Sequence, residues 1–357
     1  MNGLRLPVSD PGIGPLEIGE VAAAVASGRI TQGERVARFE AALGGLLGAH
    51  VVACSSGTAA LHLALAALGI GPGDEVLVPD LTFVATGNAP LYLGATPVLV
   101  DVAPNSWNID LEAAAALVTP RTVAIIPVHL YGVPCDMGAV RRFAEAHNLA
   151  VIEDAAEGFG GSWESRPLGT HGLMGTFSFY ANKIVTTAEG GAVATRSEMI
   201  ASRLRLLRGQ GQGARRFFHE AVGFNYRMSD VHAAIGLAQL ARLGASLACR
   251  RAIMAGYRRR LAALAPRPGM AGEAPWLFTL DLGGADPAQV ADLLARRGID
   301  SRPIFAPLHT MPAFRCAGEF PHATMISRRA ISLPTFAGMT DDDVRLVADT
   351  VLEAVRA

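Results

Sequence analysis

The chain has 357 residues, half of them hydrophobic, which is enough apolar material for a large core or for two domains. Its 31 basic and 32 acidic side chains give a formal net charge of −1, so nothing indicates a polyanionic partner such as DNA. The longest apolar run, residues 59–70, is too short to span a bilayer, and the first seven residues lack the apolar region of a secretion signal. We therefore expect a cytoplasmic protein that binds neither nucleic acid nor membrane.

Strand-like runs alternate with helical stretches from about residue 46 to residue 195, which predicts βαβ units around a mostly parallel sheet. The apolar run 59–70 is expected to form a buried helix. The predicted strands are 75–79, 96–101, 123–129, 150–154, 176–180 and 191–195, and the predicted helices between the first four are 82–92, 111–118 and 137–147.

The residue composition changes near residue 240, where an Arg- and Ala-rich helical stretch, 240–264, leads into the sequence Pro-Arg-Pro-Gly at 266–269. A strand (276–282), a helix (287–297), a loop and a last helix (340–357) follow. We interpret residues 1–240 as a large α/β domain and residues 241–357 as a small α+β domain. The four cysteines have neither metal-ligand nor disulfide spacing, so reduced thiols and no metal site are expected.

A lysine stands in an apolar, glycine-flanked segment of a chain whose cations are nearly all arginine. Lys183 follows the strand-like run 176–180 and precedes Gly190-Gly191. Partial desolvation there favours the neutral amine, which forms an imine with an aldehyde, whereas a guanidinium cannot. Taken alone, such a lysine is more often a surface residue whose stem packs on apolar neighbours. A functional interpretation therefore depends on the other segments.

Four further segments lie where open α/β sheets bind ligands, after the carboxyl ends of strands. Ser55-Ser56-Gly57-Thr58 opens the apolar helix, where free N–H groups attract phosphate, although an ordinary helix cap is the commoner use of such residues. Asp154 closes an apolar strand, where a carboxylate either holds a proton on a ring nitrogen or caps the next helix. Phe83 offers an aromatic face and 223–228 is a polar turn, but packing explains both as well.

Together these segments supply a phosphate site, a stacking aromatic ring, a carboxylate for a ring nitrogen and an imine-forming lysine. Those are the requirements of pyridoxal 5′-phosphate (PLP). Glu157 would point the same way as Asp154, one turn further on. No P-loop, zinc spacing or nucleophile elbow competes, and the glycine-rich 158–161 lacks the dinucleotide fingerprint.

With these motifs in order, the chain resembles the DegT/DnrJ/EryC1/StrS family of nucleotide-sugar aminotransferases, which have the type I fold of aspartate aminotransferase. The resemblance runs from about Pro15 to the C-terminal helix. It rests on Ser55-Ser56-Gly57-Thr58, His129-Leu130-Tyr131-Gly132, Glu153-Asp154-Ala155-Ala156-Glu157, Ser178-Phe179 with Lys183, Glu189-Gly190-Gly191, and Asn225-Tyr226-Arg227-Met228.

The resemblance implies a role for each matching residue. Lys183 matches the lysine that binds PLP covalently and moves the proton between the substrate carbon and the cofactor, which passes through the pyridoxamine form. Asp154 matches the partner of the pyridine nitrogen, and Glu157 stands near the phenolic oxygen. The other cofactor residues implied are the phosphate binders Ser56, Gly57, Thr58 and Ser178, the stacking Phe83, and Asn225, which reaches the phosphate of a neighbouring subunit in a homodimer.

The resemblance is strongest to the enzymes that make GDP-perosamine, carried by 208–211, 223–240 and 302–312. It implies GDP-4-keto-6-deoxy-mannose as acceptor and glutamate as donor. The expected substrate residues are Tyr180, Arg208, Arg227 and His309. Arg208, with Arg215 and Arg216, either holds the diphosphate or forms a solvated basic face.

Other functions stay open at this stage. A GDP-3-keto sugar and a dTDP- or UDP-linked 4-keto sugar are alternative acceptors. Related sugar dehydratases carry histidine in place of the lysine, so Lys183 argues against a lyase. A PLP-binding protein without turnover is a third possibility.

Overall fold

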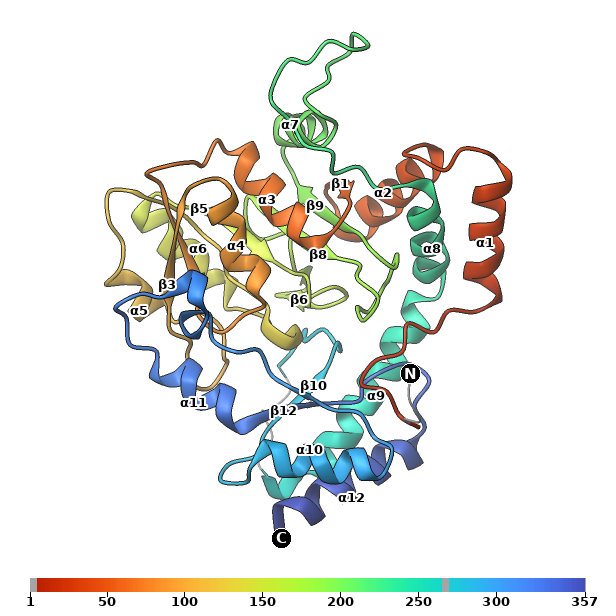
Figure 1. The fold of residues 1–357 in the computed structure, drawn as a ribbon, viewed down its shortest axis with the longest axis vertical. Coiled ribbons are helices and arrows are strands. Elements are labelled where there is room, and N and C mark those ends of the chain that lie inside the picture. Colours follow the sequence, from red (N-terminus) through yellow and green to blue (C-terminus); the bar gives the residue numbers. More distant parts are fainter. Residues whose placement is uncertain (1–4, 265–269, 357) are drawn as a thin grey trace.

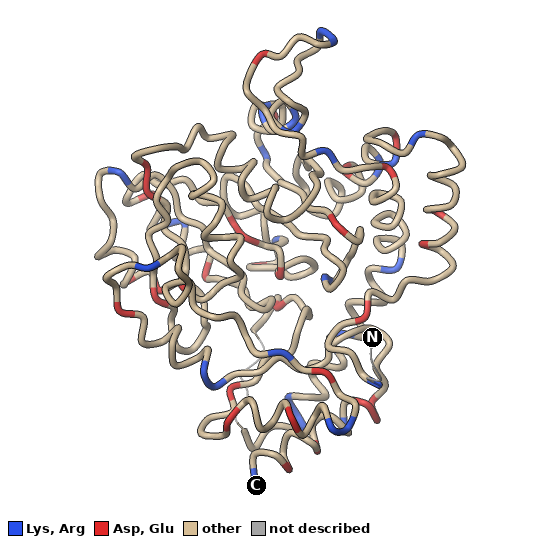
Figure 2. The backbone as a smooth tube through the Cα atoms, viewed as in Figure 1, with Lys and Arg blue, Asp and Glu red and all other residues tan. Residues whose placement is uncertain are grey.

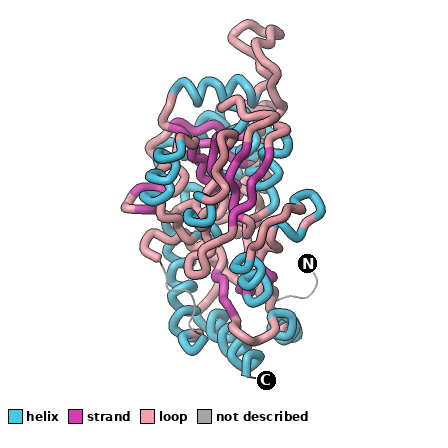
Figure 3. Tube along the Cα trace, turned by 90° about the vertical axis from the view of Figure 1, so that its left-hand side faces the viewer, coloured by secondary structure: helices cyan, strands magenta, loops and turns pink. Residues whose placement is uncertain are grey.

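The computed structural model describes residues 5–264 and 270–356. Figure 1 shows a larger part built on a central sheet and a smaller part at the C-terminal end, and Figure 3 shows that sheet edge-on between helices. The Pro-Arg-Pro-Gly sequence at 266–269 lies outside the described residues.

Within the described residues, seven strands form the central sheet in the order β1-β9-β8-β5-β4-β2-β3. β9 runs antiparallel to both of its neighbours, and the other adjacent pairs are parallel, so β1 points the same way as β8, β5, β4, β2 and β3. The strand bounds are His50–Cys54 (β1), Glu75–Pro79 (β2), Thr96–Val100 (β3), Thr122–Ile125 (β4), Ala150–Asp154 (β5), Met174–Ser178 (β8) and Gly191–Thr195 (β9).

Helices cover both faces of this sheet because its strands are apolar on both sides. Val76 and Val78 of β2 face one core with α3, while Leu77 between them faces the other core with α5 and α6, as the period of two requires. The helices of the large part are Pro15–Ala26 (α1), Glu34–Leu47 (α2), Gly57–Ala67 (α3), Val84–Tyr92 (α4), Leu111–Ala115 (α5), Met137–His147 (α6), Glu198–Arg208 (α7) and Asp230–Ala241 (α8), and a two-strand hairpin joins Ser162–Trp163 (β6) to Arg166–Pro167 (β7).

The smaller part has its own core around an antiparallel sheet of order β10-β12-β11. Leu6 belongs to this core and forms a β-bridge with Ile299, so the N-terminal segment around Leu6 packs on the smaller part. We keep the division at residue 240 as a proposal. The elements are Leu243–Arg260 (α9), Phe278–Asp281 (β10), Pro287–Arg296 (α10), Arg302–Pro303 (β11), Pro321–Arg329 (α11), Ala330–Leu333 (β12) and Asp341–Arg356 (α12).

The predicted fold class is confirmed, and three predicted strands, 75–79, 150–154 and 191–195, have the observed bounds. The strand predicted at 123–129 was too long: β4 ends at Ile125, and a 3₁₀ turn at Leu130–Gly132 follows, with Tyr131 at a φ of 54°. The helix predicted at 240–264 corresponds to α9, which ends at Arg260, and the chain bends by 65° between α8 and α9. The sequence analysis did not predict β1, β6, β7, β11, β12, α1, α2, α7 or α11.

No single helix among the described residues is long and apolar enough to span a membrane. The bent pair of α8 and α9 reaches the required length and apolarity only when the two helices are taken together.

A buried carboxylate joins two elements far apart in sequence. Asp230 at the start of α8 accepts hydrogen bonds from the backbone N–H groups of Gly33, Arg35 and Val36 at distances of 2.9, 3.2 and 2.9 Å. These are the first N–H groups of α2, which have no partner within their own helix. Asp230 therefore caps α2 from outside and fixes it against α8.

Asp230→Ala should lower the free energy of unfolding by at least about 2 kcal/mol, because it leaves buried donors without an acceptor. Asp286→Ala, which removes the exposed cap of α10, is the matched control and should cost about 1 kcal/mol. Urea unfolding of the three proteins measures both. Equal losses in the two variants would contradict the role given to Asp230.

Candidate active site

The carboxyl edge of the central sheet brings most of the predicted cofactor residues together. Ser56 follows β1, Asp154 ends β5, Ser178 ends β8 and Phe83 follows β2. Because these strands run in one direction, their carboxyl ends lie at the same edge. Lys183 stands in the turn between β8 and β9, with its backbone N–H bonded 2.9 Å from the carbonyl of Tyr180.

Asp154 is held at the end of β5 with its carboxylate directed by two donors. Its Oδ2 accepts from the hydroxyl of Thr86 at 2.8 Å, and its Oδ1 accepts from the N–H of Ala156 at 3.1 Å. Burial raises the pKa of Asp154, and these hydrogen bonds together with the charge of Lys183 oppose that rise. Each carboxylate oxygen can accept a further hydrogen bond, so Asp154 can receive a ring N–H.

The side chain of Lys183 is largely buried between a carboxylate and an indole ring. Its Nζ lies 3.8 Å from Oε1 of Glu157 and 3.9 Å from the ring centroid of Trp276. Burial lowers the pKa of the lysine, while the charges of Glu157 and Asp154 oppose this shift. The site therefore makes the neutral, nucleophilic amine more accessible than it is for a solvated lysine.

Glu157 is buried and tied to a second segment at the same edge. Its Oε2 accepts from the N–H of Tyr131 at 2.6 Å. Burial raises the pKa of Glu157 to about 7, with Lys183 acting in the opposite direction. A carboxyl group that exchanges its proton near neutral pH, beside an amine with a lowered pKa, is suited to proton transfer within the site.

Ser56, Gly57 and Ser178 form a tight concave surface at the start of α3. The hydroxyl of Ser56 accepts from the N–H of Ala59 at 3.1 Å, which is the ordinary helix cap that the sequence also allowed. A methyl group on Gly57 would lie 2.8 Å from Cβ of Ser178, and one on Gly191 would lie 2.3 Å from the carbonyl oxygen of Ser56. The first N–H groups of α3, those of Gly57 and Thr58, have no partner within the helix. Such a surface, crowded by backbone and small side chains, has the shape and the free N–H groups that a phosphate needs, and we call it the cradle.

These residues fit PLP. The cradle suits a phosphate, Asp154 suits a protonated ring nitrogen, and the buried amine of Lys183 suits an aldehyde. Phe83 stands at the N-cap position of α4. The residue is 54% exposed and its ring centroid lies 5.7 Å from that of Phe305, so the ring is accessible to a planar ligand.

Three of the predicted substrate residues are at or near the surface. Tyr180 is exposed in the lysine turn, and Arg227 is exposed and donates to Oδ1 of Asn225 at 3.3 Å. His309 is fixed by Asp80, the residue after β2: its Nδ1 lies 2.6 Å from Oδ2 and its backbone N–H is 2.8 Å from Oδ1. His309 thus belongs to the same sheet edge.

Arg208, the fourth, is buried. Its Nη1 donates to Oε1 of Glu40 at 2.5 Å and to the carbonyl of Ala53 at 2.7 Å. The guanidinium therefore ties α7 to α2 and β1, a role that the sequence did not reveal, and its contact with the diphosphate stays a prediction.

The segment that follows α7, closed by a bridge between Gln212 and His219, projects from the molecule (Figure 1). Within this segment the guanidinium groups of Arg215 and Arg216 lie over the rings of Phe218 and Phe217, respectively.

Asn225 lies in an extended segment that borders the phosphate cradle. The carbonyl of Tyr226 accepts from the N–H of Ser55 at 2.9 Å. Phe224 and Tyr226 pack on His62, so the side chains of Asn225 and Arg227 face outward, as alternation along an extended chain requires.

The sequence did not reveal Thr86, Trp276 or Asp80. The four-residue spacing of Thr82 and Thr86, whose hydroxyl oxygens are 3.0 Å apart, was a usable signal inside a predicted helix. Trp276 gave no such signal, because it is distant from Lys183 in sequence and reaches it from the smaller part of the molecule.

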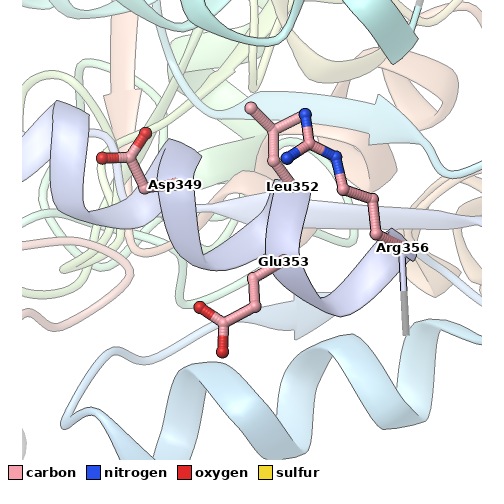
Figure 4. A pocket seen from close by; sticks show the side chains of 4 residues that line it. All are labelled: Asp349, Leu352, Glu353 and Arg356. Carbon is pink, nitrogen blue, oxygen red and sulfur yellow. The ribbon is translucent and has the colours of Figure 1, made fainter.

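A hollow along α12 is lined by Asp349, Leu352, Glu353 and Arg356 (Figure 4) and contains none of the predicted site residues. Acidic and basic residues are interspersed over the helices of the smaller part (Figure 2). Among the residues that the structure describes, no group of three His, Cys, Asp or Glu side chains could hold a metal ion.

Comparison with known proteins identifies the class. Residues 11–352 match the model of the DegT/DnrJ/EryC1/StrS aminotransferase family. The chain belongs to this family, and it is a PLP-dependent sugar aminotransferase.

Individual relatives agree. GDP-perosamine synthase of Caulobacter vibrioides is 45% identical over 330 residues, covering 88% of this chain and 89% of the relative. GDP-perosamine synthase of Escherichia coli O157:H7 is 38% identical over 310 residues, covering 85% of each. Spr1654 of Streptococcus pneumoniae, solved in its PLP form, is 28% identical with a TM-score of 0.92 over 98% of both chains.

Gly57→Ala should weaken PLP binding at least about tenfold, because the added methyl group forces Ser178 and the start of α3 apart. Absorbance titration of the apoprotein with PLP measures the affinity. Gly45→Ala, in α2, is the control, since a methyl group there meets nothing within 4 Å. Equal affinities in the two variants would show that the cradle is not the phosphate site.

Glu157→Gln should change how the stability of the apoprotein depends on pH. Above pH 4.5 the unfolded chain releases this proton, while the folded chain keeps it up to about pH 7. The free energy of unfolding contributed by Glu157 therefore falls as pH rises through this window. The variant lacks that fall and should be the more stable protein at pH 7.5 by an amount on the order of 1–3 kcal/mol.

Thermal unfolding from pH 5 to 7.5 measures this difference. Glu145→Gln, at an exposed position in α6, is the control and should follow the wild type. Parallel profiles for wild type and Glu157→Gln would refute the raised pKa.

Proposed function

We propose that the enzyme transfers an amino group from glutamate to GDP-4-keto-6-deoxy-mannose, which yields GDP-perosamine. The observation that carries this proposal is the similarity over most of the chain to two GDP-perosamine synthases, at 45% and 38% identity. The four cysteines are free thiols, which supports action in a reducing compartment such as the cytoplasm.

In this proposal the buried residues divide the chemistry among them. Bound PLP supplies an electron-accepting ring that stabilises negative charge at the reacting carbon. Lys183 holds the cofactor covalently and then carries the proton to and from that carbon. Asp154 keeps the ring nitrogen protonated, and Glu157 takes part in proton exchange with the lysine. The cradle of Ser56, Gly57, Thr58 and Ser178 holds the phosphate, and Phe83 stacks on the ring.

A panel of nucleotide ketosugars with glutamate should show GDP-4-keto-6-deoxy-mannose as the best acceptor, with the amino product identified by mass spectrometry. Lys183→Ala should lose at least about two powers of ten in turnover, because no other lysine exists in the chain. Preference for a GDP-3-keto sugar, or for a dTDP- or UDP-linked sugar, would replace the proposed substrate. Near-normal turnover in the variant would overturn the role of Lys183.

We also propose that the protein is a homodimer. An apolar groove lined by Ile13, Ile18, Val21, Ala22 and Ile235 lies against Ala181 and Ala188 of the lysine turn. α1 and its flanks expose Leu16, Val25 and Ile30 as well, each about half exposed or more. A contiguous apolar surface of this kind marks an interface, and its position beside the active site suits a second copy that completes the site.

The outward face of Asn225 supports the expectation that it reaches the phosphate of the neighbouring subunit. Its backbone runs beside the cradle of its own chain, however, so the structure allows either arrangement.

Mixing Lys183→Ala with Asn225→Ala should restore activity if Asn225 acts across the interface. In a mixed dimer one site then carries both lesions and the other carries neither. Differently tagged chains verify subunit exchange, and the activity of the purified heterodimer is compared with that of each parent. If the heterodimer gains nothing while Asn225→Ala alone is impaired, Asn225 acts within its own chain.

A further inference from the structure

Trp276 touches the lysine turn at two points. Its Nε1–H donates to the carbonyl oxygen of Asn182 at 2.9 Å, and its ring centroid lies 3.9 Å from Nζ of Lys183. The indole thus binds the backbone immediately before the lysine and the end of the lysine side chain. An ammonium or amine over an indole face is held there by electrostatic and dispersion attraction.

Trp276 is anchored by the smaller part of the molecule. The backbone carbonyl of Trp276 accepts a hydrogen bond from Nη1 of Arg250 at 3.2 Å, and the same nitrogen donates to the carbonyl of Thr335 at 2.6 Å. Arg250 is buried in α9, and Trp276 leads directly into β10. The position of the ring therefore follows the position of the small sheet.

Two further contacts restrict the ring and the turn. The ring stacks on that of Tyr131 at a centroid distance of 5.9 Å and an interplanar angle of 11°. The hydroxyl of Ser9 donates to the same carbonyl of Asn182 at 3.2 Å. The N-terminal segment and the smaller part of the molecule thus meet at the residue that precedes the lysine, and Tyr131 at the sheet edge packs on the same indole.

We propose that Trp276 is a positioning residue for Lys183. The indole of Trp276 fixes the direction of the amine and makes the reactivity of the amine depend on the position of the small domain. The inference rests on the role proposed above for Lys183 and does not depend on the sugar. A displacement of about 1 Å in a reacting group costs up to about 10²-fold in rate, so a ring that removes this freedom has a measurable effect.

The sole lysine of the chain makes a direct test possible. Untagged apoprotein labelled with ¹³C-lysine gives one lysine side-chain signal in NMR spectra. In the wild type the ε-CH₂ protons should be shifted upfield by the ring current of Trp276. Trp276→Leu should abolish the shift and Trp276→Phe should reduce it. Trp163→Phe, in the β6 strand, is the control and should leave it unchanged.

Stopped-flow absorbance with PLP separates binding from bond formation. The limiting rate of imine formation should fall about tenfold in Trp276→Leu and by less in Trp276→Phe, while the dissociation constant of the first, non-covalent complex stays the same. A merely structural tryptophan would lower the melting temperature without changing either the lysine signal or this rate. Circular dichroism checks that each variant is folded.

An unshifted lysine signal in the wild type, or a wild-type rate in folded Trp276→Leu, overturns the inference. If Trp276→Leu does not fold, Trp276→Phe serves as the test, because phenylalanine cannot donate the hydrogen bond to Asn182. A wild-type lysine signal and a wild-type rate of imine formation in Trp276→Phe would then overturn the proposal. Lys183→Met distinguishes a failure of the role proposed for Lys183 from a failure of the role proposed for Trp276. An imine absorption band that persists in Lys183→Met refutes the role of Lys183. If the band is lost in Lys183→Met but the tryptophan variants keep the wild-type lysine signal and rate, only the inference about Trp276 is refuted.

Discussion

The removal of one amine from water is the constraint on which the active site depends. Lys183 lies between the carboxylate of Glu157 and the ring of Trp276, and burial lowers the pKa of the lysine. A solvated lysine would be an ammonium ion at neutral pH and a poor nucleophile. The sheet edge, the 3₁₀ turn at Tyr131 and Trp276 from the smaller part of the molecule each contribute one wall of this environment. The lowered pKa of the amine therefore depends on several parts of the fold, although Lys183 itself lies in a single turn.

Three acids within five residues show how the fold gives similar side chains different tasks. Burial alone would raise the pKa of Glu153, but hydrogen bonds from His129 and from the N–H groups of Gly172 and Gly169 outweigh it and lower that pKa. Asp154 points to the other face of the strand, into the site, where burial prevails and its pKa rises. His129 accepts from the N–H of Cys135 through Nδ1, so its Nε2 carries the proton donated to Glu153. Glu153 thus organises the strand end that aims Asp154.

The sequence predicted what is local. Alternation of strands and helices gave the sheet, and small residues or acids at strand ends gave the cradle and Asp154, because these features need only neighbours in sequence. The burial of Arg208 was not predicted because its partners, Glu40 and the carbonyl of Ala53, are distant in the chain, and an exposed arginine has the same local pattern as a buried one. Trp276 escaped notice for the same reason. Long-range packing decides these positions, and no periodicity encodes it.

The same burial that activates the site makes it costly to fold. Lys183, Asp154 and Glu157 are ionisable groups withdrawn from water, and each shifts toward its neutral form in the folded chain. Stability has been given up here, while Asp230 and the Glu153 network add it elsewhere in the large part. A ligand that binds only the folded state stabilises that state by mass action. A cofactor that supplies a cationic ring nitrogen to Asp154 and a carbonyl carbon to Lys183 relieves two of these burial costs directly, so cofactor affinity and fold stability are coupled through these two side chains.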